Sequence, residues 1–253
     1  MLAIILAAGR GSRLAQLNPD DRPKCLLEIG GRSLLERMLE SLSQSGVRRC
    51  TMVIGYEADR IVEHVGMLRT RPEVSFHYNS RFEEGSVISL GVARDILSAG
   101  ESVLVLDADV LFHPQILERL VNSSVENCFL IDRDFVPGAE PVKIAVKGGR
   151  MVEFRKQLPP GLEYDSLGES VGFFRFGAVG AGRIARRCAR FDRDGRGDAP
   201  HEEVLREALL ERPDEFGFED ITGLPWLEID FPEDIERARN KVLPAIRADH
   251  PEY

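Results

Sequence analysis

Short apolar runs alternate with amphipathic stretches in the first half of the chain. The apolar runs have the length of buried strands, and the stretches between them repeat apolar residues with helical spacing. This pattern predicts strands at residues 2–6, 51–54, 74–78 and 103–106, and helices at 33–44, 58–68, 86–97 and 114–121. Because strands that alternate with helices are joined by crossover connections, we expect an α/β fold with a mainly parallel sheet.

The second half has a different pattern, richer in strands. Two apolar runs, 142–146 and 151–154, flank Gly148 and Gly149, which is typical of a hairpin. Further strands are predicted at 170–176 and 226–229, helices at 178–190, 201–211 and 232–246, and a charged, glycine-rich loop at 192–200. No linker or repeat separates the halves, so we expect one domain over 1–253 with a small β-rich part.

Composition limits the possible functions. The chain has 253 residues and a formal net charge of -9, which argues against a general nucleic-acid binder. No apolar run approaches the roughly 20 residues that span a bilayer, and the apolar start lacks the basic residues of a signal peptide. The four cysteines are far apart and lack zinc-ligand spacing. We therefore expect a cytoplasmic protein with no membrane span and no nucleic-acid partner.

Three polar segments, 9–13, 79–86 and 107–109, follow predicted strands, at the sheet edge where ligands of parallel sheets bind. In Gly9-Arg-Gly-Ser-Arg13, glycines allow backbone N–H groups to approach a phosphate, and the arginines add positive charge. The segment is neither a dinucleotide fingerprint, which needs glycine in place of Leu14, nor a P-loop. Taken alone, it fits a tight turn with surface arginines equally well.

Further candidates are a lysine shortly after the glycine-containing segment and several aspartates at strand ends. Lys24 is a flexible positive charge suited to a phosphate, although a lone lysine is more often simply exposed. Asp107 and Asp109 end one predicted strand, and Asp230 ends a late one. Mg2+ prefers one or two carboxylates plus phosphate oxygens, so such a set is compatible with magnesium. Each aspartate could instead cap the helix that follows it.

In order along the chain, these motifs resemble the NTP-transferase superfamily, which includes sugar-1-phosphate nucleotidyltransferases and small cytidylyltransferases. The resemblance covers most of the chain, through residues 6–14, 22–27, 30–37, 79, 85–90, 107–109 and 226–234. It implies a Rossmann-like sheet with helices on both faces. It also implies a single nucleotidyltransferase domain, with a nucleotide-binding half at about 1–125 and an acceptor-binding half at about 126–253.

The resemblance also implies roles for individual residues. Those expected to contact the nucleotide are Leu6, Ala7, Ala8, Gly9, Gly11, Ser12, Arg13, Lys24, Asn79, Gly85, Ser86 and Asp107. Lys24 and Arg13 would be catalytic by stabilising charge on the phosphates, and Asp109 and Asp230 would hold Mg2+. An ionised oxygen of the acceptor would attack the α-phosphorus and release pyrophosphate, without a general base.

The segment around Asn79 and Gly85 and the ending 228–234 look most like cytidylyltransferases for phospho-alcohols and phosphonates, which favours CTP. Phosphocholine, 2-aminoethylphosphonate and inositol 1-phosphate are candidate acceptors. Residues expected at the acceptor are Asp132, Asp134, Glu140, Lys143, Lys156, Glu169 and Trp226. An amino-alcohol would need carboxylates and aromatic faces, whereas a sugar or inositol ring would need neutral hydrogen bonding. The sequence leaves this choice open.

Two other functions fit the same motifs. One is transfer by a related enzyme, such as a hexose-1-phosphate nucleotidyltransferase that uses another NTP or a molybdopterin-type transferase. The other is a non-catalytic nucleotide sensor, against which the presence of Arg13, Lys24, Asp109 and Asp230 argues. The oligomeric state is open, with a homodimer as one option.

Overall fold

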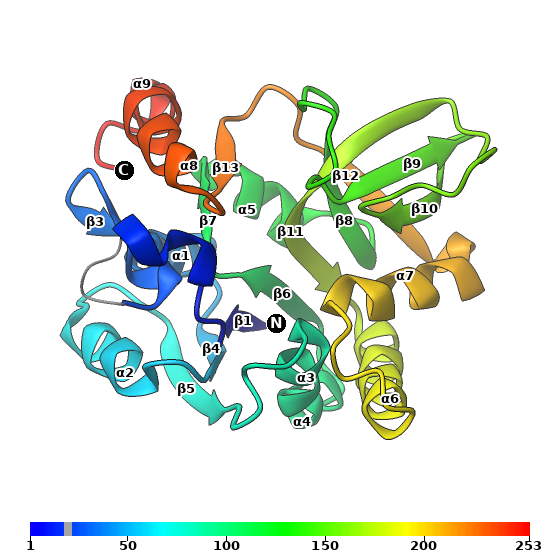
Figure 1. Ribbon diagram of the computed structural model, residues 1–253, viewed down its shortest axis with the longest axis horizontal. Coiled ribbons are helices and arrows are strands. Elements are labelled where there is room, and N and C mark those ends of the chain that lie inside the picture. The colour runs from blue at the N-terminus through cyan, green and yellow to red at the C-terminus, as the bar shows by residue number, and fades with distance from the viewer. Residues whose placement is uncertain (18–21) are drawn as a thin grey trace.

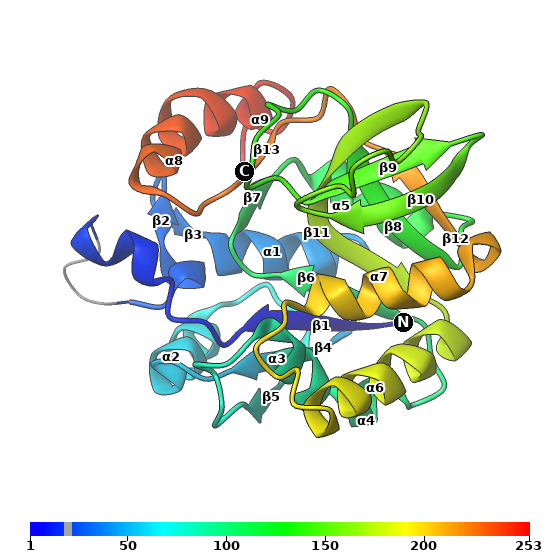
Figure 2. The same cartoon turned by 45° about the vertical axis from the view of Figure 1, so that its right-hand side comes forward.

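The computed structural model describes residues 1–17 and 22–253 and is built around one mixed sheet covered by helices on both faces (Figures 1 and 2). Among the described residues the sheet has nine strands, with the order β10-β9-β11-β6-β1-β4-β5 and with β8 and β12 added beside β11. These strands are β1 Leu2–Ala7, β4 Arg49–Ile54, β5 Glu73–Tyr78, β6 Val103–Asp107, β8 Asn127–Asp132, β9 Lys143–Lys147, β10 Arg150–Arg155, β11 Ser166–Phe176 and β12 Phe216–Asp220.

Helices and short strands complete the chain. The helices are α1 Leu34–Gln44, α2 Ala58–Met67, α3 Ser86–Val92, α4 Arg94–Leu97, α5 Pro114–Asn122, α6 Ala178–Arg193, α7 His201–Glu211, α8 Pro232–Arg237 and α9 Leu243–Asp249. Single 3-10 turns cover Ser12–Leu17, Lys24–Leu26 and Pro213–Glu215, and a π-helical turn, Ala238–Val242, joins α8 to α9. Two small antiparallel ladders pair β2 Glu28–Ile29 with β3 Arg32–Ser33, and β7 Val110–Phe112 with β13 Trp226–Glu228.

The alternation of side chains along β1 shows why helices lie on both faces. Ala3 and Ile5 point to the side packed by α1, α2 and α5, whereas Ile4 points to the side packed by α3, α4, α6 and α7. A strand buried on both faces reads as a continuous apolar run, as the sequence of β1 does. The expected fold class, a Rossmann-like α/β sheet with a β-rich second half, is confirmed.

The direction of the strands changes at β11. Strands β5, β4, β1 and β6 are parallel, but β11 runs antiparallel to β6, β8 and β9. The first part of β11 pairs with β9 and its last part with β6, and the ladder with β8 shifts between Ser170 and Phe174. Gly172 lies within this shift at a φ of +78°, and a Cβ there would come 2.5 Å from Asp107 Oδ2. A glycine therefore allows β11 to pass close beside the end of β6.

The C-terminal segment packs against the beginning of the chain. Leu14, Ile29 and Leu34 share a buried cluster with Ile229 and Leu243, and α8 contacts the 3-10 segment Ser12–Leu17. The two sequence halves are thus interleaved, and β13 ends next to the loop that follows β1. In the described part of the chain, no helix has the length and apolarity needed to cross a membrane.

Most predicted elements are present, with informative differences. Ser33 Oγ accepts a hydrogen bond from the Glu36 amide at the start of α1, and Gly46, at a φ of +79°, follows its end, as expected. The helices predicted at 86–97 and 232–246 are each interrupted, at Ala93 and by the π-helical turn. Strands β2, β3, β7, β8 and β12 were not predicted, because they are short or flanked by polar residues.

Candidate functional site

A cleft of about 460 Å³ lies where β1 and β6 end. It is lined by Leu6, Ala7, Gly9, Gly11, Ser12, Arg13, Lys24, Cys25, Ser86, Ala108, Asp109, Lys156, Glu228 and Asp230. Gly11 has a φ of +66°, and a Cβ on it would lie 3.1 Å from Lys24 Cβ, so a glycine lets the loop turn closely around this lysine. The loop and the lysine therefore face one cavity.

Lys24 is clamped between two carboxylates from distant parts of the chain. Its Nζ lies 2.7 Å from Asp109 Oδ2 and 2.6 Å from Asp230 Oδ1. Burial by itself would lower the pKa of Lys24, but the two aspartates outweigh burial and raise it above its ordinary value. In turn, burial opposes ionisation of Asp230, yet Lys24 holds the pKa of this carboxyl below its ordinary value. The Lys24 ammonium and the Asp230 carboxylate are therefore charged near neutral pH.

The same carboxylates form the one cluster in the described residues that has metal-ligand spacing. One oxygen each of Asp109, Glu228 and Asp230 lies within 4.8 Å of the others. Asp109 Oδ1 is buried and has no hydrogen-bond partner among the described residues, so it is available as a ligand. Mg2+ takes few protein carboxylates and keeps places for phosphate oxygens, and this set fits it. Glu228 was not predicted, although it lies two residues before Asp230 and thus on the same side of the segment.

Arg13 connects this cluster to the next pocket. Its Nη1 donates to Asp230 Oδ2 at 3.2 Å and lies 3.7 Å from Glu140 Oε2. Lys156 Nζ pairs with the same Glu140 oxygen at 3.1 Å. Among the described residues, the lining of the cleft has three cations, Arg13, Lys24 and Lys156. Asp230 binds the first two of them.

One side of the cleft is built by α3 and the loop before α7. Ser86 begins α3 and lines the cleft, and its Oγ lies 3.0 Å from His201 Nδ1 and accepts from the His201 amide at 2.8 Å. Gly85 donates its N–H to Gly197 O, and a Cβ on Gly85 would lie 2.2 Å from Ala199 O. The loop predicted at 192–200 is therefore hydrogen-bonded against the start of α3.

Four residues expected at the nucleotide do not line the cleft. Ala8 is buried and its carbonyl accepts from Tyr56, and Asn79 is buried and donates to Ser89 Oγ at 3.0 Å. Gly85 and Asp107 are also not among the lining residues, and Asp107 Oδ1 is 3.8 Å from His201 Nε2. These residues support the cleft, because their polar groups are directed to neighbouring protein atoms.

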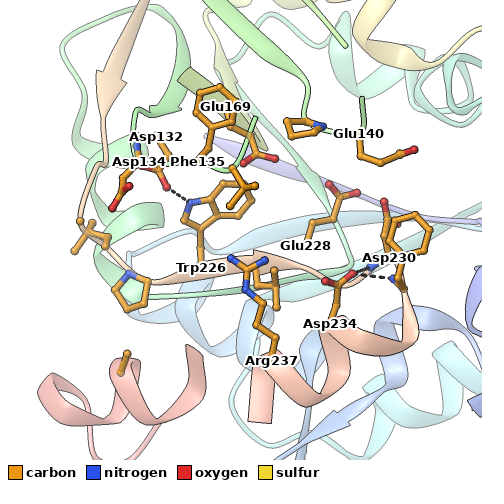
Figure 3. A pocket seen from close by; sticks show the side chains of 18 of the residues that line it. Asp132, Asp134, Phe135, Glu140, Glu169, Trp226, Glu228, Asp230, Asp234 and Arg237 are labelled. Carbon is orange, nitrogen blue, oxygen red and sulfur yellow. Dashed lines mark hydrogen bonds between the residues drawn. The ribbon is translucent and has the colours of Figure 1, made fainter. Parts of the chain in front are cut away.

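A second pocket, of about 570 Å³, adjoins the cleft and shares Glu228 and Asp230 with it (Figure 3). Its other lining residues are Asp132, Asp134, Phe135, Val136, Glu140, Pro141, Glu169, Gly223, Leu224, Pro225, Trp226, Leu227, Phe231, Asp234, Arg237, Ala245 and Asp249. Five residues expected at the acceptor are among them: Asp132, Asp134, Glu140, Glu169 and Trp226. Two ligands could therefore meet at the shared carboxylates.

The wall of the second pocket is held by hydrogen bonds and by strand register. Trp226 Nε1 donates to Asp132 Oδ2 at 2.8 Å, which fixes the indole ring. Glu169 on β11 is in register with Asp132 on β8 and with Lys143 on β9. Burial, and then the charge of Asp132, raise the pKa of Glu169 to about 7.

The two lysines expected at the acceptor are placed differently. Lys156 lines the first cleft and not the second pocket. Lys143 lines neither, because its buried Nζ donates to the carbonyls of Gly138, Pro141 and Lys156. The Lys143 ammonium therefore holds the surrounding backbone, and the structure does not bring it to either pocket, although the sequence predicted it at the acceptor.

Known proteins resemble this chain in sequence and in fold. A family model described as a MobA-like NTP transferase domain matches residues 3–150, which is more than half of the chain. A CTP:phosphoglutamine cytidylyltransferase of Campylobacter jejuni is 24% identical, with 93% of this chain and 98% of that protein covered. A bifunctional IPC transferase and DIPP synthase of Rubrobacter xylanophilus is 29% identical over 95% of this chain, which spans only 52% of that protein.

A further relative and two solved structures extend the comparison. A CMP-5'-(3-aminopropyl)phosphonate synthase of Streptomyces rubellomurinus is 26% identical over 96% of this chain and 39% of its own length. The inositol-1-phosphate CTP transferase of T. maritima has a TM-score of 0.74 at 20% identity, with 97% and 96% of the two chains covered. CTP:phosphocholine cytidylyltransferase of Streptococcus pneumoniae has a TM-score of 0.71 at 20% identity, with 94% and 97% covered. The solved structures show that the fold is shared.

Proposed function

Since the chain belongs to the family of MobA-like NTP transferase domains, we propose that it transfers the CMP part of CTP to a phosphorylated alcohol or a phosphonate. The products would be a CMP conjugate and pyrophosphate, and the reaction would require Mg2+. The observation that carries the proposal is the joining of two pockets at Glu228 and Asp230, one rich in phosphate-binding groups and the other suited to a small acceptor. The names of three similar proteins support CTP as the donor.

The first cleft offers what a triphosphate needs. Backbone N–H groups of the loop from Gly9 to Ser12 and the side chains of Arg13 and Lys24 can hold phosphate oxygens. Asp109, Glu228 and Asp230 would hold Mg2+, which when bound neutralises phosphate charge and orients the phosphates. The Lys24 ammonium lies between two of these carboxylates, and its flexible stem allows it to turn toward the α-phosphate.

The chemistry then depends on position and charge. An oxygen of the acceptor's phosphate or phosphonate, entering from the second pocket, forms a bond to the α-phosphorus of CTP. The bond from that phosphorus to the oxygen bridging the β-phosphorus breaks, and pyrophosphate leaves. The attacking oxygen is already ionised, so no side chain has to remove a proton. Lys24 and Arg13 stabilise the negative charge that spreads over the phosphoryl oxygens.

The test is pyrophosphate release with Mg2+, crossing CTP, UTP, GTP, ATP and dTTP with a panel of acceptors. The panel contains phosphocholine, 2-aminoethylphosphonate, inositol 1-phosphate, glycerol phosphate and hexose 1-phosphates. We expect turnover with CTP and one phospho-alcohol or phosphonate. Turnover with a hexose 1-phosphate and another NTP would keep the mechanism but replace the substrates. Tight NTP binding without pyrophosphate release from any pair would instead indicate a nucleotide sensor.

A further inference from the structure

The second pocket has an excess of negative charge that the protein itself does not balance. In the described part of the chain its lining has eight carboxylates and one guanidinium, that of Arg237. Several of the carboxylates have partners: Asp230 and Glu140 pair with cations of the first cleft, and Asp234 accepts from two backbone amides. By contrast, the Glu169 carboxylate forms no hydrogen bond or ion pair with any described residue.

Glu169 lacks a partner although a lysine is next to it in the sheet. Lys143 is its register neighbour on β9, but the Lys143 ammonium is bound by three backbone carbonyls. On the other side, Asp132 on β8 adds a second negative charge. The pKa of Glu169 is raised to about 7 by burial and by Asp132, and Arg237 and Lys143 only partly oppose this. The negative charge of ionised Glu169 is therefore not compensated by the described residues, and a positively charged ligand would compensate it.

The pocket also presents an aromatic face. The Trp226 ring lines the pocket with its N–H already used by Asp132, so the ring face is the part that remains for a ligand (Figure 3). An ammonium group is attracted both to a carboxylate and to the face of an indole ring. A neutral polyol would leave the charge of Glu169 without compensation.

We infer that the acceptor carries an amino or quaternary ammonium group, which pairs with Glu169 beside the Trp226 ring. This inference rests on the proposed function, because it assigns the second pocket to the acceptor. The acceptor's phosphate or phosphonate then lies at the other end of the pocket, near Glu228 and Asp230, where the first cleft begins. Glu169 is thus the residue that selects the acceptor.

The experiment compares two ligands that differ in charge and hardly in shape, 2-aminoethylphosphonate and propylphosphonate. Binding of each to the whole chain is measured by calorimetry, and kcat/KM is measured with CTP and Mg2+. We expect the amino compound to bind about tenfold more tightly or better. Phosphocholine and its neutral analogue 3,3-dimethylbutyl phosphate form a second pair for a quaternary ammonium.

The variant Glu169→Gln keeps the shape of the side chain and removes its charge. We expect it to lose the preference for the amino compound while KM for CTP and binding of propylphosphonate stay unchanged. Glu163→Gln, at an exposed glutamate paired with Lys147, is the matched control and should keep the preference. Because the ligand comparison uses the unmodified chain, it decides the question even if the variant folds poorly.

The outcomes separate this inference from the proposed function. Equal binding of both members of each pair, or a preference for the neutral member, would overturn the ammonium inference. Turnover with inositol 1-phosphate but with no amino acceptor would do the same and would keep the transferase. If the amino compounds bind selectively through Glu169 but no acceptor releases pyrophosphate, the inference about the pocket holds and the proposed reaction fails.

Discussion

The two adjoining pockets are both lined by several carboxylates, but the protein balances this negative charge in the first cleft and not in the second pocket. In the first cleft, Lys24 is held within 2.7 Å of both Asp109 and Asp230. The described lining has three cations, Arg13, Lys24 and Lys156, against the three carboxylates of Asp109, Glu228 and Asp230, so the charges balance inside the protein. In the second pocket, Glu169 pairs with no cation among the described residues, and Lys143, its register neighbour in the sheet, donates to backbone carbonyls instead. A bound metal ion and triphosphate can replace the ion pairs within the first cleft. The carboxylates of the second pocket instead need a positive charge from their ligand.

The largest effect is expected when the balance of charge in the first cleft is broken by removing Lys24. Lys24→Ala removes the ammonium that stabilises charge on the α-phosphate, so we expect kcat for pyrophosphate release to fall by about 100-fold or more. Lys241→Ala, at an exposed lysine on the π-helical turn, is the control. Nearly normal turnover of the Lys24 variant would remove this residue from the mechanism.

A somewhat smaller effect is expected at the carboxylates. Asp109→Asn keeps the size of the side chain but removes a charge from the proposed metal site. We expect the Mg2+ concentration for half-maximal activity to rise by about tenfold or more, with lower turnover. Asp95→Asn, at an exposed aspartate on α4, should leave the titration unchanged. An unaltered Mg2+ titration in Asp109→Asn would mean that the metal binds elsewhere.

The raised pKa of Glu169 in the second pocket predicts that KM for an amino acceptor depends on pH. Glu169 has a pKa of about 7, and pairing with an ammonium requires its ionised form. As the pH falls from 8 to 6, protonation of Glu169 should raise KM for 2-aminoethylphosphonate, by up to about tenfold for each unit below 7. Asp132, Lys143 and Arg237 are the charged groups that act on the same carboxyl. The pH profile of KM for Glu169→Gln, subtracted from that of the unmodified protein, isolates the contribution of Glu169. Identical pH profiles for the two proteins would contradict this prediction.

The smallest effect is expected at Lys143, which does not form an ion pair with Glu169. Lys143→Met removes the ammonium from three carbonyls, so we expect a loss of about 1–3 kcal/mol in unfolding free energy, measured by urea denaturation. The preference for an amino acceptor should remain, because the Glu169 carboxylate is untouched. Lys147→Met, at an exposed lysine, is the control. If Lys143→Met lost the preference and kept its stability, the contrast between the two pockets would be wrong.

The sequence predicted the parts of the site that follow strands directly. Gly9, Gly11 and Arg13 come after β1, Asp109 comes after β6, and Asp230 comes after β13, and all of them line the first cleft. Such residues can be found from sequence because ligands of parallel sheets bind where strands end. The capping of α1 by Ser33 was predicted for a similar reason, since it depends on residues only three positions apart.

The partners of each charge depended on the tertiary structure. Lys24 and Asp230 are 206 residues apart, and only the packing of α8 and β13 against the start of the chain brings them to 2.6 Å. Strand β8 was not predicted, so the register that places Asp132 beside Glu169 could not be foreseen. The sequence by itself determined which residues could bind phosphate and metal, since local motifs carry that chemistry. Only the tertiary structure decided which of them meet, because strand order and side-chain direction depend on contacts between distant segments.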